Sequence, residues 1–259
     1  MSKHLGSVAA VFITALTVGA AAPAFAQRSG PQGESYASIA TLPDWSGIWV
    51  RPWAEFEEEN ARRRDPANPN PPKLTAEGIK ARDTFQITRS TAQSVADPAA
   101  GTCYTGQTAG VPGVMRFSFG IEFLFTPGRV TMLLEQGSTI RRIHTDGRPH
   151  TSDPEQSYVG ESIGHWEGET LVIDTSAIET GVPLSPGIPS SGKMRIVERI
   201  RRVGPARIEI ETVIEDPVML REPWRYRATY ERSTFGWFDR KCGNDRDGRD
   251  QEPDLTPPK

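Results

Sequence analysis

The strongest constraint in this sequence is the alternation along residues 193–216, KMRIVERIRRVGPARIEIETVIED. Placing Arg202 opposite Ile208 makes isoleucines face one another on one side of two strands, while arginines face glutamates on the other side. The charged pairs are then Arg201–Glu209, Arg199–Glu211 and Arg195–Glu215. Opposite charges across an antiparallel pair are favourable, and a one-residue slip would turn the isoleucines outward. The pattern therefore predicts a hairpin with one buried face and one solvent face.

Other stretches repeat this period of two. FSFGIEFLFTPGRVTMLLE alternates across Pro127-Gly128, a turn signal. This turn predicts three facing pairs: Phe125–Val130, Phe123–Met132 and Ile121–Leu134. Further strands are expected within 139–150 and 222–233. We therefore expect an all-β fold, in which an antiparallel meander closes into a lipocalin-like barrel or a strongly curved sheet. About eight strands suffice to enclose one small ligand.

The N-terminal part of this domain has a different pattern. AEFEEENARRR (54–64) has a helical composition. Residues 74–90 are also predicted to be helical, with Thr75 as the N-cap. One or two helices should therefore precede most of the strands.

The first residues have the order of a secretory signal peptide. Lys3 is followed by an apolar run and by Ala24-Phe25-Ala26, a small-x-small cleavage site. The alternative, a membrane anchor, is less favoured because the run is rich in Ala and Gly and ends in this processing motif. We expect cleavage before Gln27, a periplasmic location and no membrane anchor after cleavage. The expected domains are a signal peptide (1–26), a disordered linker (27–43), a single β-barrel-like domain (44–242) and a flexible charged tail (243–259).

Charge and cysteine content narrow the classes of partner. The net charge of −3 and the lack of a basic patch with interleaved aromatics argue against nucleic-acid binding. The two cysteines, Cys103 and Cys242, are expected to form a disulfide in an oxidising compartment; two free thiols are the alternative. A zinc site with these cysteines lacks the usual CxxC spacing.

Three sequence segments, taken together, match a pattern found in other proteins: IEFLFTPGRV, IGHWEGETLVIDT and VERIRR. They resemble a group of exported, mostly uncharacterised proteobacterial proteins that carry a GHSIGxWEGDTLVVDT-like motif. The resemblance implies an exported β-rich domain and no particular reaction. Glu161 stands where that motif has His, so chemistry at this position would differ here. WSGIW at residues 45–49 is similar to the first-strand motif of lipocalins.

The segment 157–175, SYVGESIGHWEGETLVIDT, is expected to be a hairpin with polar groups on a partly apolar face. With Glu167-Gly168 as the turn, Glu161 lies opposite Asp174, on the same face as His165. If that face is dry, the two carboxylates would share a proton beside a histidine, which is usable for acid–base chemistry. The alternative is a solvated rim with nearby arginines as counter-ions: Arg141, Arg142 or Arg148.

Glu198 is a second anomaly, because the 193–216 register points it inward, opposite Thr212. A buried carboxylate needs a partner or a proton. It could serve as a base or a ligand anchor, or it could be held by a structural hydrogen bond from a tyrosine. The expected partners are Tyr226, Tyr230, Arg142 and His144.

No cofactor motif is present, and a three-histidine metal site of His144, His150 and His165 has no support in their spacing. We therefore expect neither a cofactor nor a metal. A hydrolytic triad is also not predicted, since the chain shows no strand–helix alternation of the kind that positions a nucleophilic serine.

Three hypotheses for function follow. The first is a binding protein for a small amphipathic molecule, preferably aromatic, inside the barrel; its expected ligand-binding residues are Arg142, His144, Trp224, Tyr226 and Tyr230. The second is a cofactor-independent lyase or isomerase; its expected catalytic residues are His165, Glu198, Glu161 and Asp174. The third is a structural periplasmic protein. The sequence names neither the ligand nor the oligomeric state.

Overall fold

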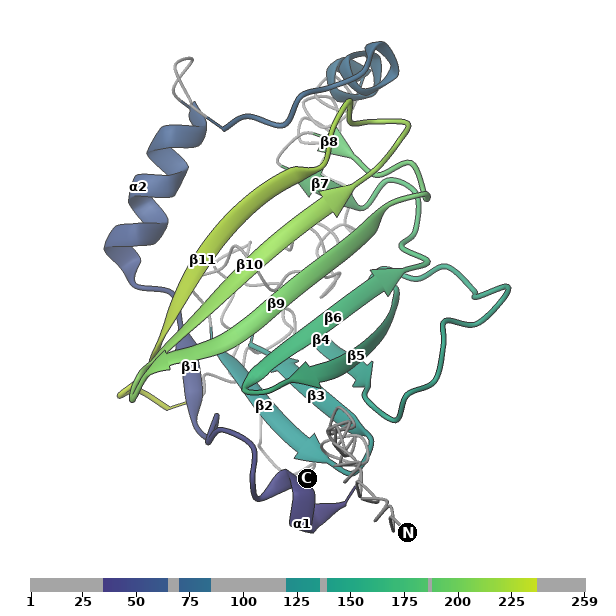
Figure 1. Cartoon of the computed structure of the whole chain (residues 1–259). Coiled ribbons are helices and arrows are strands. Elements are labelled where there is room, and N and C mark those ends of the chain that lie inside the picture. Colours follow the sequence, from purple (N-terminus) through teal and green to yellow (C-terminus); the bar gives the residue numbers. More distant parts are fainter. Residues whose placement is uncertain (1–34, 65–69, 85–119, 136–138, 186–187, 237–259) are drawn as a thin grey trace, which may run out of the picture.

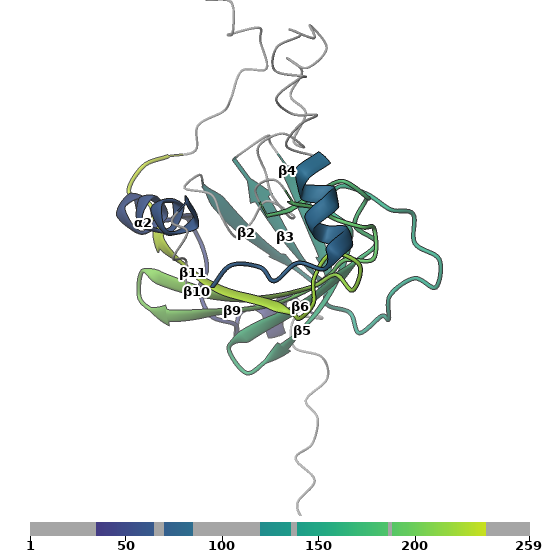
Figure 2. The same cartoon turned by 90° about the horizontal axis from the view of Figure 1, so that it is seen from above.

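The computed structural model describes residues 35–64, 70–84, 120–135, 139–185 and 188–236. These residues are mostly β, with a closed barrel of nine strands in the order β1-β11-β10-β9-β6-β5-β4-β3-β2. Figure 1 shows β9, β10 and β11 crossing the front of the barrel, and Figure 2 shows β2, β3 and β4 forming the opposite wall. The expected all-β barrel is therefore confirmed.

The barrel strands are β1 (Ile48–Val50), β2 (Ile121–Thr126), β3 (Arg129–Leu134), β4 (Thr139–His144), β5 (Glu161–Glu167), β6 (Thr170–Ser176), β9 (Arg195–Gly204), β10 (Arg207–Glu215) and β11 (Trp224–Arg232). A separate two-stranded sheet contains β7 (Pro183–Ser185) and β8 (Ile188–Pro189). The labelled helices are α1 (Tyr36–Ile39) and α2 (Trp53–Arg64), and residues 76–84 form a further helix.

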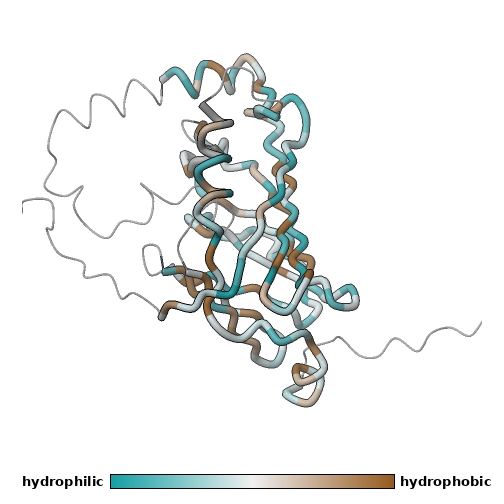
Figure 3. The backbone as a smooth tube through the Cα atoms, turned by 90° about the vertical axis from the view of Figure 1, so that its left-hand side faces the viewer, coloured by the Kyte–Doolittle hydropathy of each residue, from teal (hydrophilic) through white to brown (hydrophobic). Residues whose placement is uncertain are grey.

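The two strongest sequence patterns gave the correct register. In β9–β10, Ile200 pairs with Ile210 and Ile196 with Ile214, as expected, and all four side chains are buried. The arginines and glutamates alternate with them on the outer face, and the three predicted Arg–Glu pairs lie directly opposite one another. The three predicted pairs of β2–β3 are also confirmed. In Figure 3 apolar and polar residues alternate along the strands, which is the basis of both predictions.

The predicted register of the β5–β6 hairpin is wrong. Glu167 pairs with Thr170 and Glu161 pairs with Ser176, so Glu161 is not opposite Asp174. The turn is at residues 168–169, and Gly168 occupies its first position with φ +61°. A positive φ suits glycine, so this residue fixes the turn one position later than expected. Because the pairing changes by two residues in total, the residues still share the faces predicted for them.

One strand pair in the barrel is parallel, unlike an entirely antiparallel meander. β4 and β5 run in the same direction and pair at two points, Ile143–Ser162 and His144–Ile163. Strands that alternate in direction can close a ring only if their number is even, so a nine-strand barrel requires such an exception. The connection 145–160 makes it possible by returning β5 to the same end of the barrel; Figure 1 shows this segment projecting from the barrel wall.

The interior contains two apolar clusters. The first contains Trp45, whose ring lies 5.0 Å from that of Phe123 and 5.3 Å from that of Trp166. The second cluster lies toward the other end of β9 and β10, and contains Ile196 and Ile214. It is covered by residues of the β7–β8 region and by the helix 76–84, whose cap is confirmed because the Gly78 amide donates to Thr75 Oγ1 at 3.0 Å.

The N-terminal helices are partly as expected. α2 matches the predicted helix 54–64, and Glu55 ties it to β10 through Arg207 at 2.9 Å. Residues 36–39 lie in the segment expected to be disordered, yet they form α1, closed by a capping box between Ser35 and Ser38. The predicted signal peptide (1–26), both cysteines and the predicted flexible tail (243–259) lie outside the described residues, as does the end of the predicted helix 74–90. No helix in the described ranges is long and apolar enough to cross a bilayer.

Replacing Gly160 by alanine should destabilise the barrel strongly. Gly160 has φ +67°, and an added Cβ would lie 2.4 Å from the Ser176 carbonyl oxygen and 2.8 Å from Ile178 Cγ1. Gly168→Ala is the matched control, since φ is +61° there and nothing lies within 4 Å. Both changes should cost about 1–2 kcal/mol for the left-handed backbone, and Gly160→Ala should cost roughly 1–3 kcal/mol more for the clash. Urea denaturation measures both; equal losses would contradict the expected close approach of β5 and β6.

Candidate functional site in the barrel interior

A buried ion pair lies inside the barrel. Glu198 on β9 and Arg141 on β4 are 0% and 1% exposed, and Arg141 Nη2 donates to Glu198 Oε2 at 2.5 Å. The inward position of Glu198 opposite Thr212 is therefore as predicted. Its partner is not one of the four expected residues, because Arg141 shares the inward face of β4 with Ile143 whereas Arg142 points outward and is exposed.

Arg141 also holds two hydroxyl groups. Its Nε donates to Ser162 Oγ on β5 at 3.1 Å, and its Nη2 donates to Thr175 Oγ1 on β6 at 2.7 Å. The two hydroxyls lie 2.9 Å from each other, so they are hydrogen-bonded as well. One guanidinium thus links the four consecutive strands β4, β5, β6 and β9, and it does so beside the short parallel β4–β5 ladder.

Three atoms of this polar layer have no hydrogen-bond partner among the described residues: Arg141 Nη1, Glu198 Oε1 and Thr212 Oγ1. Thr212 is 1% exposed, so all three groups are shielded from bulk water. Leaving a buried polar group unsatisfied costs about 1–3 kcal/mol. A charged donor, a charged acceptor and a hydroxyl therefore face the interior with hydrogen-bonding capacity to spare.

The polar layer lies between the two apolar clusters. Along β9, Glu198 separates Ile196 of one cluster from Ile200 of the other, and along β10 Thr212 separates Ile214 from Ile210. Tyr226 of β11 pairs with Thr212 and packs against both clusters. A molecule that reached this layer would therefore meet polar atoms with apolar surfaces above and below them.

Sequence reasoning missed Arg141, Ser162 and Thr175 as members of this site. In the segment TIRRIH, isoleucines at 140 and 143 fall on opposite faces, so alternation alone does not show which arginine points inward. Ile143 is fully buried and Ile140 is 44% exposed, which settles the question. For Thr175 a signal existed, since it shares a strand face with the buried Leu171 and Ile173, and Ser162 shares its face with the partly buried Trp166.

The four residues predicted to be catalytic do not come together. Glu198 is inside the barrel, whereas Glu161, His165 and Asp174 lie on the outer face of β5 and β6. His165 is largely exposed, with a 63% exposed side chain, and its Nε2 lies 3.1 Å from Glu167 Oε1. The hypothesis that this face is dry is wrong, because the opposite face, which carries Leu171 and Ile173, faces the core.

A second polar cluster lies on that outer face. His150 Nδ1 is 2.9 Å from Glu161 Oε2 and 3.1 Å from Ser176 Oγ, and Glu161 also accepts hydrogen bonds from the amide and hydroxyl of Thr151. His150 Nε2 is 3.7 Å from Asp174 Oδ1, and Arg195 donates to both oxygens of Asp174. These contacts attach the 145–160 connection to β5 and β6.

Both carboxylates of the outer cluster are stabilised in the charged form. The hydrogen bond from the Thr151 hydroxyl holds the pKa of Glu161 below its usual value. Partial burial opposes this effect, and the hydrogen bond with His150 adds to it. Burial alone would raise the pKa of Asp174, but the hydrogen bond and charge of Arg195 outweigh it and lower the pKa. The predicted proton shared between these two residues, with a raised pKa, is therefore wrong.

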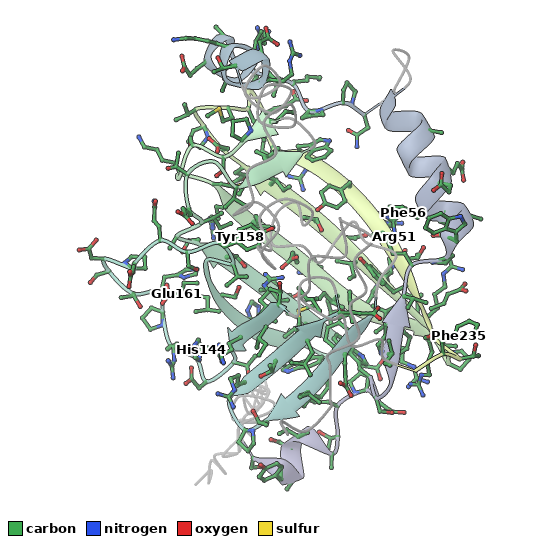
Figure 4. The ribbon with its side chains drawn as sticks, turned by 180° about the vertical axis from the view of Figure 1, so that it is seen from behind. Arg51, Phe56, His144, Tyr158, Glu161 and Phe235 are labelled. Carbon is green, nitrogen blue, oxygen red and sulfur yellow. The ribbon has the colours of Figure 1, made fainter. Side chains whose placement is uncertain are left out.

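The residues predicted to bind a ligand divide between inside and outside. Trp224 and Tyr230 are buried and inward, and Tyr226 is partly buried with its ring 5.1 Å from that of Trp224. Arg142 and His144 belong to the outward row of β4. Burial, followed by the charge of Arg148, lowers the pKa of His144. Figure 4 shows His144 and Glu161 on one flank of the barrel and Arg51 on the other.

Similarity to known proteins does not identify the functional site of this chain. Comparison with protein-family models, with curated proteins and with solved structures gives no match. Within the described ranges, no group of three or more His, Cys, Asp or Glu side chains is arranged to hold a metal ion. Of the two polar clusters, the outer one has one unpartnered buried atom, His150 Nε2, and its carboxylates are already paired, whereas the interior one has three unpartnered atoms on side chains that are at most 1% exposed. The interior layer is therefore the candidate site.

Breaking the interior ion pair from one side should destabilise the fold more than removing it altogether. Arg141→Met leaves a buried unpaired carboxylate, and we expect a loss of about 3–5 kcal/mol in the free energy of unfolding. The double variant Arg141→Met/Glu198→Leu should lose clearly less than the sum of its single variants. Arg227→Met, which breaks an exposed pair with Glu211 on the outer face, should cost less than about 1 kcal/mol. Additive losses in urea denaturation would contradict coupling between Arg141 and Glu198.

Acid should destabilise the folded protein partly through Glu161. A carboxyl whose pKa is lower when folded stabilises the protein above its unfolded pKa, and this stabilisation is lost as pH falls through the folded value. For Glu161 the loss should begin near pH 4.5, its ordinary pKa. In Glu161→Gln the free energy of unfolding should therefore fall less steeply below that pH. Glu169→Gln, an exposed carboxylate in the same hairpin, is the control; identical slopes for wild type and Glu161→Gln would refute the assignment.

Proposed function

We propose that this protein binds a small amphipathic molecule, preferably an aromatic one, inside its barrel, with the polar end of the molecule at the Arg141–Glu198 layer. The observation that carries the proposal is the set of three unpartnered polar atoms on Arg141, Glu198 and Thr212, on side chains at most 1% exposed. A ligand that supplied their missing hydrogen bonds would recover a cost that the folded protein otherwise bears.

The apolar surroundings support an amphipathic ligand rather than a wholly polar one. Trp224 and Ile214 lie on one side of the layer, and Ile200, Ile210 and Tyr230 lie on the other. Tyr226 lies at the level of the layer and packs against both clusters. Binding sites for small organic molecules combine such apolar and aromatic walls with a few placed polar groups. An aromatic body would gain from the tilted ring pair of Trp224 and Tyr226, because rings pack favourably edge to face or offset.

We place this binding function in the periplasm, after export. The support is the order of residues 1–26, in which a positive start, an apolar run and Ala24-Phe25-Ala26 follow one another. A ligand for an exported protein of this size would come from the surroundings of the cell or from its envelope. The resemblance to exported proteobacterial proteins points the same way.

A second candidate is proton transfer in the same interior site, as in a cofactor-independent lyase or isomerase. Glu198 Oε1 favours it, because this carboxylate oxygen has no hydrogen-bond partner among the described residues while Oε2 is held by Arg141. Glu198 would take the proton and Arg141 would stabilise negative charge on the substrate. His165, Glu161 and Asp174 have no part in this version, because they lie on the outer face.

Native mass spectrometry tests the binding proposal. The whole chain, exported by a bacterial host and purified from its periplasm, should carry a small molecule that mild denaturation releases. The same spectrum should show a chain that begins at Gln27. If Cys103 and Cys242 form a disulfide, its mass should also be lower than that of the reduced chain by the hydrogens that the bond removes. If nothing co-purifies, a panel of bicyclic aromatic molecules should still bind with dissociation constants below about 1 mM, which is the threshold for weak affinity. Failure of both would contradict the proposal.

A further inference from the structure

We infer that the interior site selects ligands whose polar group is uncharged and both donates and accepts hydrogen bonds, such as a hydroxyl, a phenol or a primary amide. The inference rests on the proposed function and specifies its ligand class. It follows from the charge balance of the polar layer and from which of its atoms are already used.

The charges of the layer already cancel. Arg141 contributes one positive charge and Glu198 one negative charge, joined at 2.5 Å, and the other members are the hydroxyls of Ser162, Thr175 and Thr212. A carboxylate or an ammonium group on the ligand would add a charge with no counter-charge in the layer. Burying an unpaired ion costs several kcal/mol, so the site should reject ions of either sign.

The spare atoms also select by hydrogen-bond type. Arg141 Nη1 can only donate and Glu198 Oε1 can only accept, whereas the hydroxyl of Thr212 can do both. A ketone or an ether only accepts and would leave Glu198 Oε1 without a partner. A hydroxyl group can accept from Arg141 and donate to Glu198, and a primary amide can do the same with its oxygen and nitrogen.

The positions of these atoms favour one ligand group over two. The Nη2–Oε2 contact holds the guanidinium and the carboxylate against each other, so their remaining atoms belong to groups in direct contact. Thr212 lies directly opposite Glu198 in the β9–β10 ladder, where side chains of facing residues have Cβ atoms about 4.5–5.5 Å apart. One polar group placed beside the ion pair is therefore within reach of all three side chains.

Four probes with the same ring system test this selectivity: 1-naphthol, 1-naphthoate, 1-naphthylmethylammonium and naphthalene. Their dissociation constants are measured at neutral pH by titration calorimetry against the full mature chain. We expect 1-naphthol to bind at least about tenfold more tightly than either ion, and more tightly than naphthalene. Equal affinity of 1-naphthol and naphthalene would overturn the inference, because the polar layer would then make no bond to the ligand.

Two variants identify the atoms responsible. Glu198→Gln leaves the charge of Arg141 uncompensated, so the preference should move toward 1-naphthoate by at least about tenfold. Thr212→Val removes a hydroxyl without changing the charge, so it should weaken 1-naphthol several-fold and leave naphthalene unchanged. Thr212→Val also keeps the ion pair intact and so tests the inference even if Glu198→Gln fails to fold. Glu211→Gln, on the outer face, is the control and should leave all four constants unchanged.

The outcomes separate this inference from the proposed function. If all four probes bind with similar affinity, the barrel binds aromatic molecules and the selection by charge and hydrogen-bond type is refuted. If 1-naphthoate binds best to the wild type, the charge balance of the layer is refuted while binding stands. If none of the four probes binds although a small molecule co-purifies with the protein, the inference fails and the proposed function stands. If no probe binds and nothing co-purifies, both fail.

Discussion

The contact between Arg141 and Glu198 joins strands on both sides of the one parallel junction in this barrel. Nine strands cannot alternate all the way round a closed ring, so β4 and β5 run parallel and share two paired positions. Arg141 starts from β4 at this short ladder and binds Ser162 on β5, Thr175 on β6 and Glu198 on β9. Its guanidinium thus reinforces with side chains a junction that has few backbone hydrogen bonds.

The same contact gives the interior its chemistry. An ion pair in a protein core is weak evidence for stability, since well-packed apolar residues often replace such a pair without loss. Here the pair leaves Nη1 and Oε1 unused and lies between two apolar clusters. A layer built only to hold strands together would be expected to satisfy its polar atoms. The spare donors and acceptors at this depth are the basis of the proposed binding function.

The outer cluster around His150 has a structural explanation. Its contacts to Glu161 and Ser176 attach the 145–160 connection to the sheet, and that connection is what brings β5 back parallel to β4. The polar residues of the 157–175 segment are therefore used mainly in closing the barrel from outside. The buried, incompletely paired polar groups that the sequence suggested for this face lie instead on the opposite face, at the Arg141–Glu198 pair.

The sequence by itself determined the β9–β10 and β2–β3 registers, the inward position of Glu198 and the apolar inner faces of these two hairpins, because a period of two is a local property that either burial or charge pairing enforces. It did not determine the β5–β6 register, where the left-handed backbone of Gly168 sets the turn. It also predicted the wrong arginine, since Arg142 was expected at the interior site, and Ile140 and Ile143, on opposite faces of the same strand, do not show which arginine points inward. Only closure of the barrel decided that, because the partner of Arg141 lies 57 residues away on β9, and no local pattern brings two such residues together.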